Sequence, residues 1–357
     1  PRFAEPGLPS VWYPPVRKPE RAAAEIRFNT SEGLAWQAIR SPVIGGTVDL
    51  AGRPVFKLVV GENELPSTQW EVVSVHEEAE QFRAVAEYRK EGLVLQAELL
   101  AKRTALDEVE LTLDVKNLAD APVVGKLFFP CLDDVAIGSA ADTWYFCGRT
   151  CGVMQREPGA WRDVIGEDHP LQVDGFFNPA VGGGVCLLPR DRSGLYRWYC
   201  VGKNDTGGHY ALEFLPETVQ PRASWSCVRV AVAVEPGDWR DQFHRYTRWL
   251  NTWHKPVAPR KEWFRKIFAF PTYFPAGGDL SRLNLQAYVQ QVKEALGACD
   301  YIHLYGWAIT PEYGHWGEYD HFHQYGKEGG KERFIQAVRD CQAQGTRVGM
   351  YLDGYLV

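Results

Sequence analysis

Three features are missing from this 357-residue sequence, and each absence narrows what the protein does. No apolar run approaches the ~18 residues of a membrane-spanning helix, so we expect no membrane partner. The net charge is −6, from 39 Lys and Arg residues against 45 Asp and Glu residues. A surface that binds phosphates normally carries clustered cations, so we expect no nucleic acid as a partner. No internal repeat or low-complexity tract is visible, so the chain is not built from a repeated unit.

Cysteine is present, but its spacing does not form a metal-binding or disulfide framework. Only Cys147 and Cys151 lie close in sequence, and no second Cys/His pair has the spacing of a zinc finger. We interpret the cysteines as structural thiols, with a local disulfide or a metal site as the alternatives, and expect no metal and no cofactor. This usage favours a reducing compartment, and the predicted location is cytoplasmic. The eight cysteines are Cys131, Cys147, Cys151, Cys186, Cys200, Cys227, Cys299 and Cys341.

Aromatic residues, in contrast, are abundant: the chain has 13 Trp, 16 Tyr and 17 Phe residues. Such content fits the thick core of a β-sandwich, and it also fits a carbohydrate site, where flat rings stack on sugar faces. The length is enough for two domains and a sizeable core. We therefore predict a multidomain protein of the β plus α/β class. A carbohydrate substrate is the expected partner, and assembly into a homo-oligomer is left open.

The first two thirds of the chain predict a large β-sandwich. Residues 1–30 are rich in proline and charge and predict an N-terminal arm, of which Ala22–Phe28 pairs at a sheet edge. Residues 31–235 alternate apolar and polar positions in at least ten short segments, which predicts a two-sheet β-supersandwich. Residues 141–180 have weak periodicity and are expected to form a long insertion or loop. The clearest alternating strands are Phe82–Arg89, Leu93–Lys102 and Glu108–Asn117.

A helical linker and the start of a parallel sheet are predicted to follow. Residues 236–265 carry aromatic side chains at helical spacing after Asp238, a candidate N-cap, and form the linker. Residues 266–357 alternate three apolar runs with two helical patterns, the second closed by Gly345. This order predicts the first three βα units of a TIM-type barrel, which needs about eight strands. The apolar runs are Ile267–Phe274, Tyr301–Ile309 and Arg347–Val357.

Candidate site residues follow from the rule that parallel βα folds place the active site at the carboxyl ends of their strands. The loop Thr310–Gly326 after the second strand is dense in rings, carboxylates and imidazoles, which suit the C–H faces and hydroxyl groups of a polyhydroxylated ligand. The alternatives are core packing, solvated charges, or a metal held by His321 and His323 with His315 and Asp320. The predicted substrate-binding residues are Tyr273, Tyr305, Trp307, His315, Trp316, Glu318, Asp320 and Asp353.

Three of these segments resemble a known family. Leu304–Trp307, His315–Phe322 and Arg347–Val357 are similar to the opening barrel strands of retaining α-glycosidases related to α-galactosidases, in glycoside hydrolase families 27, 31 and 36. They are also similar to uncharacterised bacterial glycoside-hydrolase-like proteins. In family 36 a large supersandwich precedes the barrel through a helical linker, which is the order predicted here. The resemblance implies a retaining glycoside hydrolase.

The sequence departs from that family at two strand ends. α-Galactosidases carry Asp-Asp-Gly-Trp where this chain has Leu304–Trp307, and their Glu-Pro-Glu stands here as Asp353–Tyr355, so the sugar is not assigned. The resemblance places the nucleophile and the acid/base on strands four and six, which we expect beyond Val357, and so the catalytic residues are unknown. Retaining hydrolysis needs two carboxyl groups about 5–5.5 Å apart, so we expect these 357 residues alone to be inactive.

Two other functions fit the same predicted fold. A non-catalytic carbohydrate-binding or scaffold protein would bind sugar through sandwich aromatics and would need no pair of carboxylates. A mutarotase- or lyase-like enzyme would instead work on the sandwich face, with acid/base residues from its strands. The candidates for that chemistry are His76, Asp133, Asp134 and His209.

Overall fold

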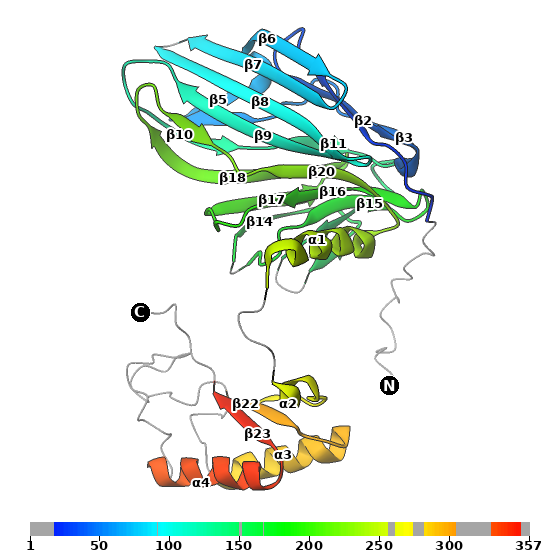
Figure 1. Ribbon diagram of the computed structural model, residues 1–357, viewed down its shortest axis with the longest axis vertical. Coiled ribbons are helices and arrows are strands. Elements are labelled where there is room, and N and C mark those ends of the chain that lie inside the picture. The colour runs from blue at the N-terminus through cyan, green and yellow to red at the C-terminus, as the bar shows by residue number, and fades with distance from the viewer. Residues whose placement is uncertain are drawn as a thin grey trace. The chain divides into compact units, whose positions relative to one another are not determined.

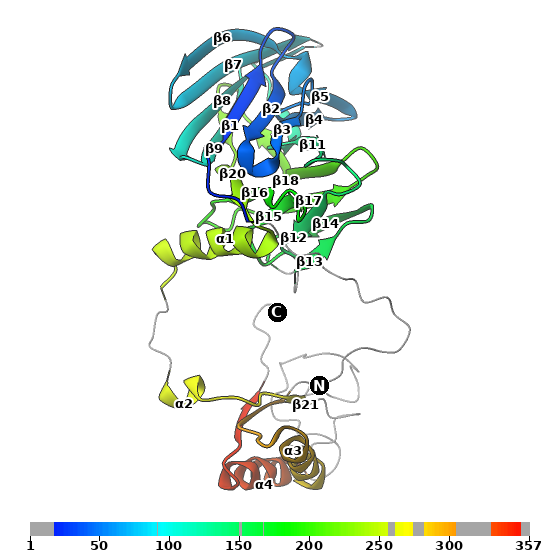
Figure 2. The same ribbon diagram turned by 90° about the vertical axis from the view of Figure 1, so that its right-hand side faces the viewer.

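The computed structural model describes residues 18–90, 92–149, 152–166, 168–255, 261–273, 282–304 and 330–350. The chain divides into two compact units, Pro1–His254 and Lys255–Val357, each with its own apolar core (Figures 1 and 2). Among the described residues, no helix combines the length and the apolar character needed to cross a membrane.

The first unit is a β-sandwich whose larger sheet has ten antiparallel strands (Figure 1). These are β6 (Glu71–Glu78), β7 (Gln81–Lys90), β8 (Leu93–Ala105), β9 (Glu108–Asn117), β12 (Trp144–Cys147), β13 (Val153–Gln155), β15 (Asp174–Asn178), β16 (Gly183–Pro189), β19 (Ser224–Ser226) and β20 (Val230–Pro236). Their order is β13-β12-β15-β16-β20-β9-β8-β7-β6, with β19 paired to β9.

The second sheet has seven strands, and a three-stranded sheet lies beside it (Figure 2). The seven strands are β4 (Lys57–Val60), β5 (Asn63–Pro66), β10 (Val123–Phe128), β11 (Leu132–Val135), β14 (Gly159–Val164), β17 (Arg197–Lys203) and β18 (Gly208–Val219). Their order is β14-β17-β18-β10-β4-β5, with β11 paired to β18. The small sheet is β1 (Glu25–Asn29), β2 (Ala35–Ser41) and β3 (Gly46–Asp49), and the short 3-10 helices are Pro42–Ile44 and Ser67–Gln69. The edge strand β1 covers most of the predicted edge segment Ala22–Phe28.

Alternation along the strands builds the core, as the sequence predicts. β9 coincides with the predicted strand Glu108–Asn117, and its apolar side chains are buried while most of the intervening ones are half-buried or exposed. Large buried rings, including Trp36, Trp70, Tyr199 and Phe214, fill the space between the sheets. The predicted β-sandwich is therefore confirmed.

The prediction that residues 141–180 form a loop is wrong. The segment contains β12, β13, β14 and β15, and every residue of β12 and β15 is buried. Both faces of this part of the ten-stranded sheet are covered, one by the sandwich core and the other by helix α1 (Trp239–Trp253). A strand that is buried on both faces has no solvent-facing positions, so its sequence need not alternate polar and apolar residues.

Helix α1 begins where the sequence predicts. The Asp238 carboxylate accepts a hydrogen bond from the Arg240 backbone N–H at 2.9 Å, and the Asp241 side chain accepts one from the Asp238 backbone N–H at 3.2 Å. The second bond, together with one from the Asp241 backbone N–H to the Asp238 side chain, forms a capping box. The aromatic face of the helix packs on the ten-stranded sheet, where it meets Phe146 and Phe177. The helix is thus part of the sandwich unit.

The second unit is a small parallel α/β fold. Its elements are α2 (Glu262–Arg265), β21 (Thr272–Tyr273), α3 (Arg282–Leu296), β22 (Tyr301–Leu304), α4 (Gly330–Ala343) and β23 (Arg347–Met350). The strands pair in parallel in the order β21-β22-β23, and α3 packs against α4. The predicted alternation of strands and helices is observed in the described residues, and closure into a barrel stays a prediction.

The first of these strands is shorter than predicted. Within the described part of the run, Ile267–Tyr273, only Thr272 and Tyr273 lie in a strand. The Asp300 carboxylate accepts hydrogen bonds from the backbone N–H groups of Phe268 and Ala269, both at 3.0 Å. A side chain that takes these N–H groups replaces the ladder partners of a regular strand, which explains the late start of β21.

Candidate functional site

Of the predicted substrate-binding residues, one lies in the described part of the chain. Tyr273, in β21, is half-buried, and its ring centroid lies 4.8 Å from that of Tyr288 on α3. It therefore contributes to the packing of the second unit. The alternative metal ligands His321 and His323 lie outside the described residues. So do the remaining predicted contacts, which stay predictions: Tyr305, Trp307, His315, Trp316, Glu318, Asp320 and Asp353.

The sandwich brings together three of the four residues that were considered for acid/base chemistry on its face. Asp133 and Asp134 lie on β11, and His209 lies on β18, the strand that pairs with β11. Charge interactions link His209 to both carboxylates. His76 is elsewhere, exposed on β6 with its Nε2 atom 2.8 Å from Glu78 Oε1. We name Asp133, Asp134, His209 and the cavity beside them the outer-sheet site.

The outer-sheet site lies on the face of the seven-stranded sheet that is turned away from the sandwich core. Along β18, Tyr210 and Leu212 are buried in the core, whereas His209 and Ala211 are half-buried on the opposite face. A cavity of about 290 Å³ lies there, with walls from β4, β5, β10, β11, β17 and β18. Polar and aromatic residues that line it include Lys57, Glu64, Phe128, Asp133 and His209.

Burial moves the two central titratable groups in opposite directions. Burial raises the pKa of Asp133, although the nearby His209 acts to lower it. Burial also lowers the pKa of His209, although the charges of Asp133 and Asp134 act to raise it. The pKa of Asp134 is lowered, chiefly by a hydrogen bond from Thr206 and further by Arg53, whose Nε donates at 2.6 Å. The neutral imidazole can accept a proton from a bound ligand. The carboxyl group beside it keeps its proton to a higher pH than a free aspartate does, so it can donate one.

Other side chains at this cavity do not supply a nucleophile. Burial raises the pKa of Cys131 and raises that of Cys200 to about 12, so both remain thiols at neutral pH. The Phe128 ring is approached by two ammonium groups, with Lys57 Nζ 4.8 Å and Lys126 Nζ 5.7 Å from its centroid. The site therefore offers acid/base groups and cationic hydrogen-bond donors.

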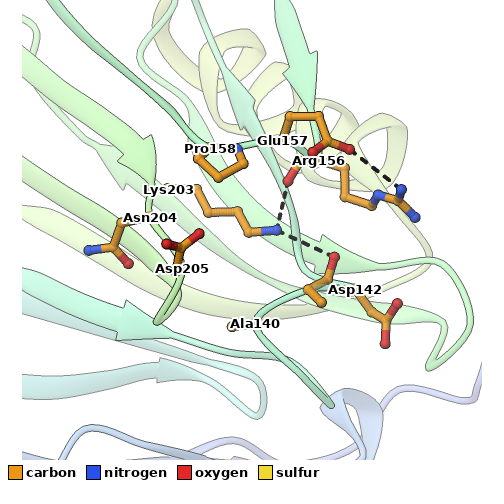
Figure 3. A pocket seen from close by; sticks show the side chains of 9 residues that line it. Ala140, Asp142, Arg156, Glu157, Pro158, Lys203, Asn204 and Asp205 are labelled. Carbon is orange, nitrogen blue, oxygen red and sulfur yellow. Dashed lines mark hydrogen bonds and ion pairs between the residues drawn. The ribbon is translucent and has the colours of Figure 1, made fainter.

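A second cavity, of about 320 Å³, opens at the end of β17 (Figure 3). The buried Lys203 ammonium group beside it donates hydrogen bonds to the carbonyl oxygens of Thr143 at 2.8 Å, Arg156 at 2.7 Å and Ala141 at 3.5 Å. Burial lowers the pKa of Lys203. These bonds use all three donors of an ammonium group, so Lys203 holds two loops against the sheet. Sequence analysis missed this role, because a lysine at a strand end usually lies in solvent.

Comparison with known proteins finds similarity in fold and not in sequence. No protein-family model matches the chain, and no curated protein matches it. The α-N-acetylgalactosaminidase NagBb from Bifidobacterium bifidum, in complex with GalNAc, matches 94% of this chain at 12% identity with a TM-score of 0.64. Its ligand-free structure gives a TM-score of 0.59. An α-galactosidase from Lactobacillus brevis matches 95% of the chain at 11% identity, with a TM-score of 0.43 over 49% of its own length.

The similarity to NagBb concerns the fold, because 12% identity carries no information on site residues. The uncovered part of this chain is much shorter than the unit Lys255–Val357, so the match extends into both units. This chain spans 58% of the length of the NagBb structure. What this chain shares with NagBb is thus its fold.

Proposed function

We propose that this chain belongs to a retaining, α-glycosidase-like glycoside hydrolase and carries its sandwich together with one wall of the active site. The observation that most supports this proposal is the fold similarity to NagBb, which includes both units and not the sandwich alone. The second support is the resemblance of the segments around Leu304–Trp307 and Arg347–Val357 to the opening strands of such enzymes.

In this proposal the second unit binds the sugar at the carboxyl ends of its parallel strands. The tyrosine and tryptophan rings stack on the sugar, and the carboxylates and imidazole bind hydroxyl groups. Hydrolysis then follows the retaining scheme, in which one carboxylate attacks the anomeric carbon and a second protonates the leaving oxygen. Those two carboxylates are not assigned to residues of this chain. The proposed contacts are Tyr273, Tyr305, Trp307, His315, Trp316, Glu318, Asp320 and Asp353.

Sugar binding by the 357-residue chain tests this proposal. Titration with GalNAc, galactose and glucose, followed by ligand-observed NMR, should show saturable binding of at least one sugar. Asp353→Asn and Glu318→Gln should each weaken that binding by about tenfold, which corresponds to roughly 1.4 kcal/mol. Glu78→Gln is the matched control, because Glu78 is an exposed carboxylate on β6 in the sandwich. Binding that survives both substitutions unchanged would contradict the proposal.

A second candidate function is proton transfer on a sugar at the outer-sheet site, and the opposite pKa shifts of Asp133 and His209 favour it. One group would remove the proton of the anomeric hydroxyl while the other protonates the ring oxygen, so that the ring opens and can close to either anomer. NMR of freshly dissolved α-anomers measures this interconversion. Asp133→Asn and His209→Gln should abolish any acceleration, and His76→Gln should preserve it. A rate equal to that in buffer would exclude this function.

A further inference from the structure

The sandwich interior contains a second group of histidine, carboxylate and thiol side chains, which neither proposed function uses. Cys147, His169 and Asp174 are each 0% exposed. Cys147 on β12 and Asp174 on β15 are direct partners across the two strands, so their side chains project to the same side of the sheet. His169 comes from the connection between β14 and β15 and reaches the same point. We name these three residues the interior cluster.

The donor atoms of the interior cluster lie close enough together to surround one ion. Cys147 Sγ lies 3.7 Å from His169 Nδ1, whereas Asp174 Oδ1 lies 3.2 Å from the other ring nitrogen, Nε2, so the two contacts are made by different atoms of the ring. One ligand atom from each residue can be chosen so that all three lie within 4.8 Å of one another. In a tetrahedral zinc site, bonds of about 2.3 Å to sulfur and about 2.0 Å to nitrogen place those two atoms about 3.5 Å apart.

The protein alone does not satisfy the polar atoms of the interior cluster. Asp174 Oδ1 accepts a hydrogen bond from the Gly148 backbone N–H at 3.0 Å, but Asp174 Oδ2 has no hydrogen-bond partner among the described residues. A carboxylate oxygen left unpaired in a protein interior is costly, and a cation removes that cost. The His169 ring is held in place by the Tyr199 ring, stacked at 3.7 Å between centroids and 10° between planes. Rigid, oriented ligands are typical of metal sites.

A thiol beside an imidazole and a carboxylate also resembles an activated nucleophile, but the surroundings exclude that role. Burial raises the pKa of Cys147, with a further increase from Asp174, so the thiol keeps its proton in the metal-free protein. All three side chains are sealed from solvent, so no substrate reaches them. A bound metal ion would reverse the protonation, because a coordinating thiol is deprotonated outright.

We propose that Cys147, His169 and Asp174 bind one zinc ion inside the sandwich. The ligands would be the Cys147 thiolate, one ring nitrogen of His169 and Asp174 Oδ2, with the fourth tetrahedral position left for water. Binding forms a zinc–sulfur bond, and the thiol proton leaves to solvent. A thiolate and an imidazole together favour zinc over magnesium or calcium, which prefer oxygen ligands. The ion would fasten the connection between β14 and β15 to the ten-stranded sheet.

Because the cluster is sealed, zinc must enter during folding, and the test loads it then. The full chain is produced with zinc, or refolded from urea with zinc or cobalt, and metal content is measured after extensive dialysis. We expect one zinc per chain and a thermal midpoint several degrees above that of protein refolded with a chelator. The cobalt form should show near-ultraviolet absorption from a cobalt–thiolate bond. Properly folded protein that contains neither metal would overturn the proposal, with buried water as the occupant of the site.

Substitutions assign the ligands. Cys147→Ser should remove the cobalt–thiolate absorption, whereas Cys227→Ser should retain it, because Cys227 lies half-buried beside β19 and away from the cluster. His169→Gln and Asp174→Asn should each reduce the zinc content well below one per chain. If Cys147→Ser does not fold, the spectrum of the cobalt-loaded wild-type protein is the remaining test. Absence of cobalt–thiolate absorption in that spectrum would exclude Cys147 as a ligand. Retention of that absorption in folded Cys147→Ser protein would equally refute the assignment.

Discussion

The outer-sheet site and the interior cluster use the same residue types and differ in their access to water. Asp133 and His209 are half-buried beside a cavity, whereas His169 and Asp174 are closed off on every side. At the open site a ligand can enter and exchange protons with both groups. Once the protein has folded, no ligand reaches the closed site, so any charge there must be neutralised by groups or ions enclosed during folding. The comparison shows that burial, more than residue type, decides which chemistry a histidine and an aspartate can perform.

A third polar group shows how the protein neutralises buried charge without a metal, and its disruption should have the largest effect. Arg245 donates to Asp107 at 2.6 Å and to Glu108 at 3.1 Å, and it also pairs with Glu235. Arg245→Met would leave these buried carboxylates short of a cation, and we expect a loss of about 3–5 kcal/mol in the free energy of unfolding. Urea unfolding measures it. Arg248→Met on the same helix is the control, since its side chain is mostly exposed and lies 3.9 Å from Glu235.

If Arg245→Met and Arg248→Met were equally stable, the buried carboxylates would have found other partners. Arg21 contacts Asp107 at 3.2 Å and Glu235 at 2.7 Å, and Arg190 contacts Glu108 at 2.6 Å, so both arginines are the candidates. In that case the carboxylates would still be paired with cations, as buried carboxylates require.

The two histidines allow a direct test of the comparison. His169→Gln should lower the free energy of unfolding by about 1–3 kcal/mol, because it leaves buried polar groups without their partner. His209→Gln should change the free energy of unfolding much less. The His209 ring is half-buried beside the cavity, so water can replace its contacts. Urea unfolding of both variants at one pH gives the two numbers. Equal losses would mean that the open and closed sites do not differ in the way proposed here.

The sequence predicts local features well, because their causes are local. The N-cap at Asp238 is confirmed by its capping box, and the helix end at Gly345 is confirmed by a left-handed φ of +82° and a hydrogen bond from its N–H to Gln342 at 3.0 Å. Strands with one solvated face, such as β9, were found from their alternation alone. Each of these signals lies within a few residues of the feature that it marks.

The sites depend on pairings between distant segments, and no local pattern encodes those. Asp133 meets His209 only because β11 pairs with β18, and Cys147 meets Asp174 only because β12 pairs with β15. The sequence named Asp133 and His209 as candidates without showing that they meet, and it placed β12 and β15 in a loop. The predicted sugar contacts from Tyr305 to Asp353 lie outside the described residues, so they stay predictions.

The smallest expected effect on stability is at Asp133 and Asp134, the two adjacent aspartates of the outer-sheet site. Here the direction of the change tells more than its size. Burial raises the pKa of Asp133 in the folded protein above its ordinary value of 3.8, so the folded state holds this proton more tightly than the unfolded state does. Its contribution to stability is therefore complete below about pH 3.8 and is lost as the pH rises through the folded pKa. Asp133→Asn removes the ionisation, so the variant should have a higher urea midpoint than the wild-type protein at pH 7. In acid the two midpoints should become equal.

Asp134→Asn is the matched control and should act in the opposite direction. The hydrogen bond from Thr206 and the nearby Arg53 lower the pKa of Asp134, so its contribution to stability is present above about pH 3.8 and is lost as the pH falls through the folded pKa. Asp134→Asn should then lower the urea midpoint at pH 7, and the two variants should converge as the pH falls. A shift of both variants in the same direction at pH 7 would mean that Asp133 is stabilised as a carboxylate. The outer-sheet site would then lack the neutral acid that its proposed chemistry requires.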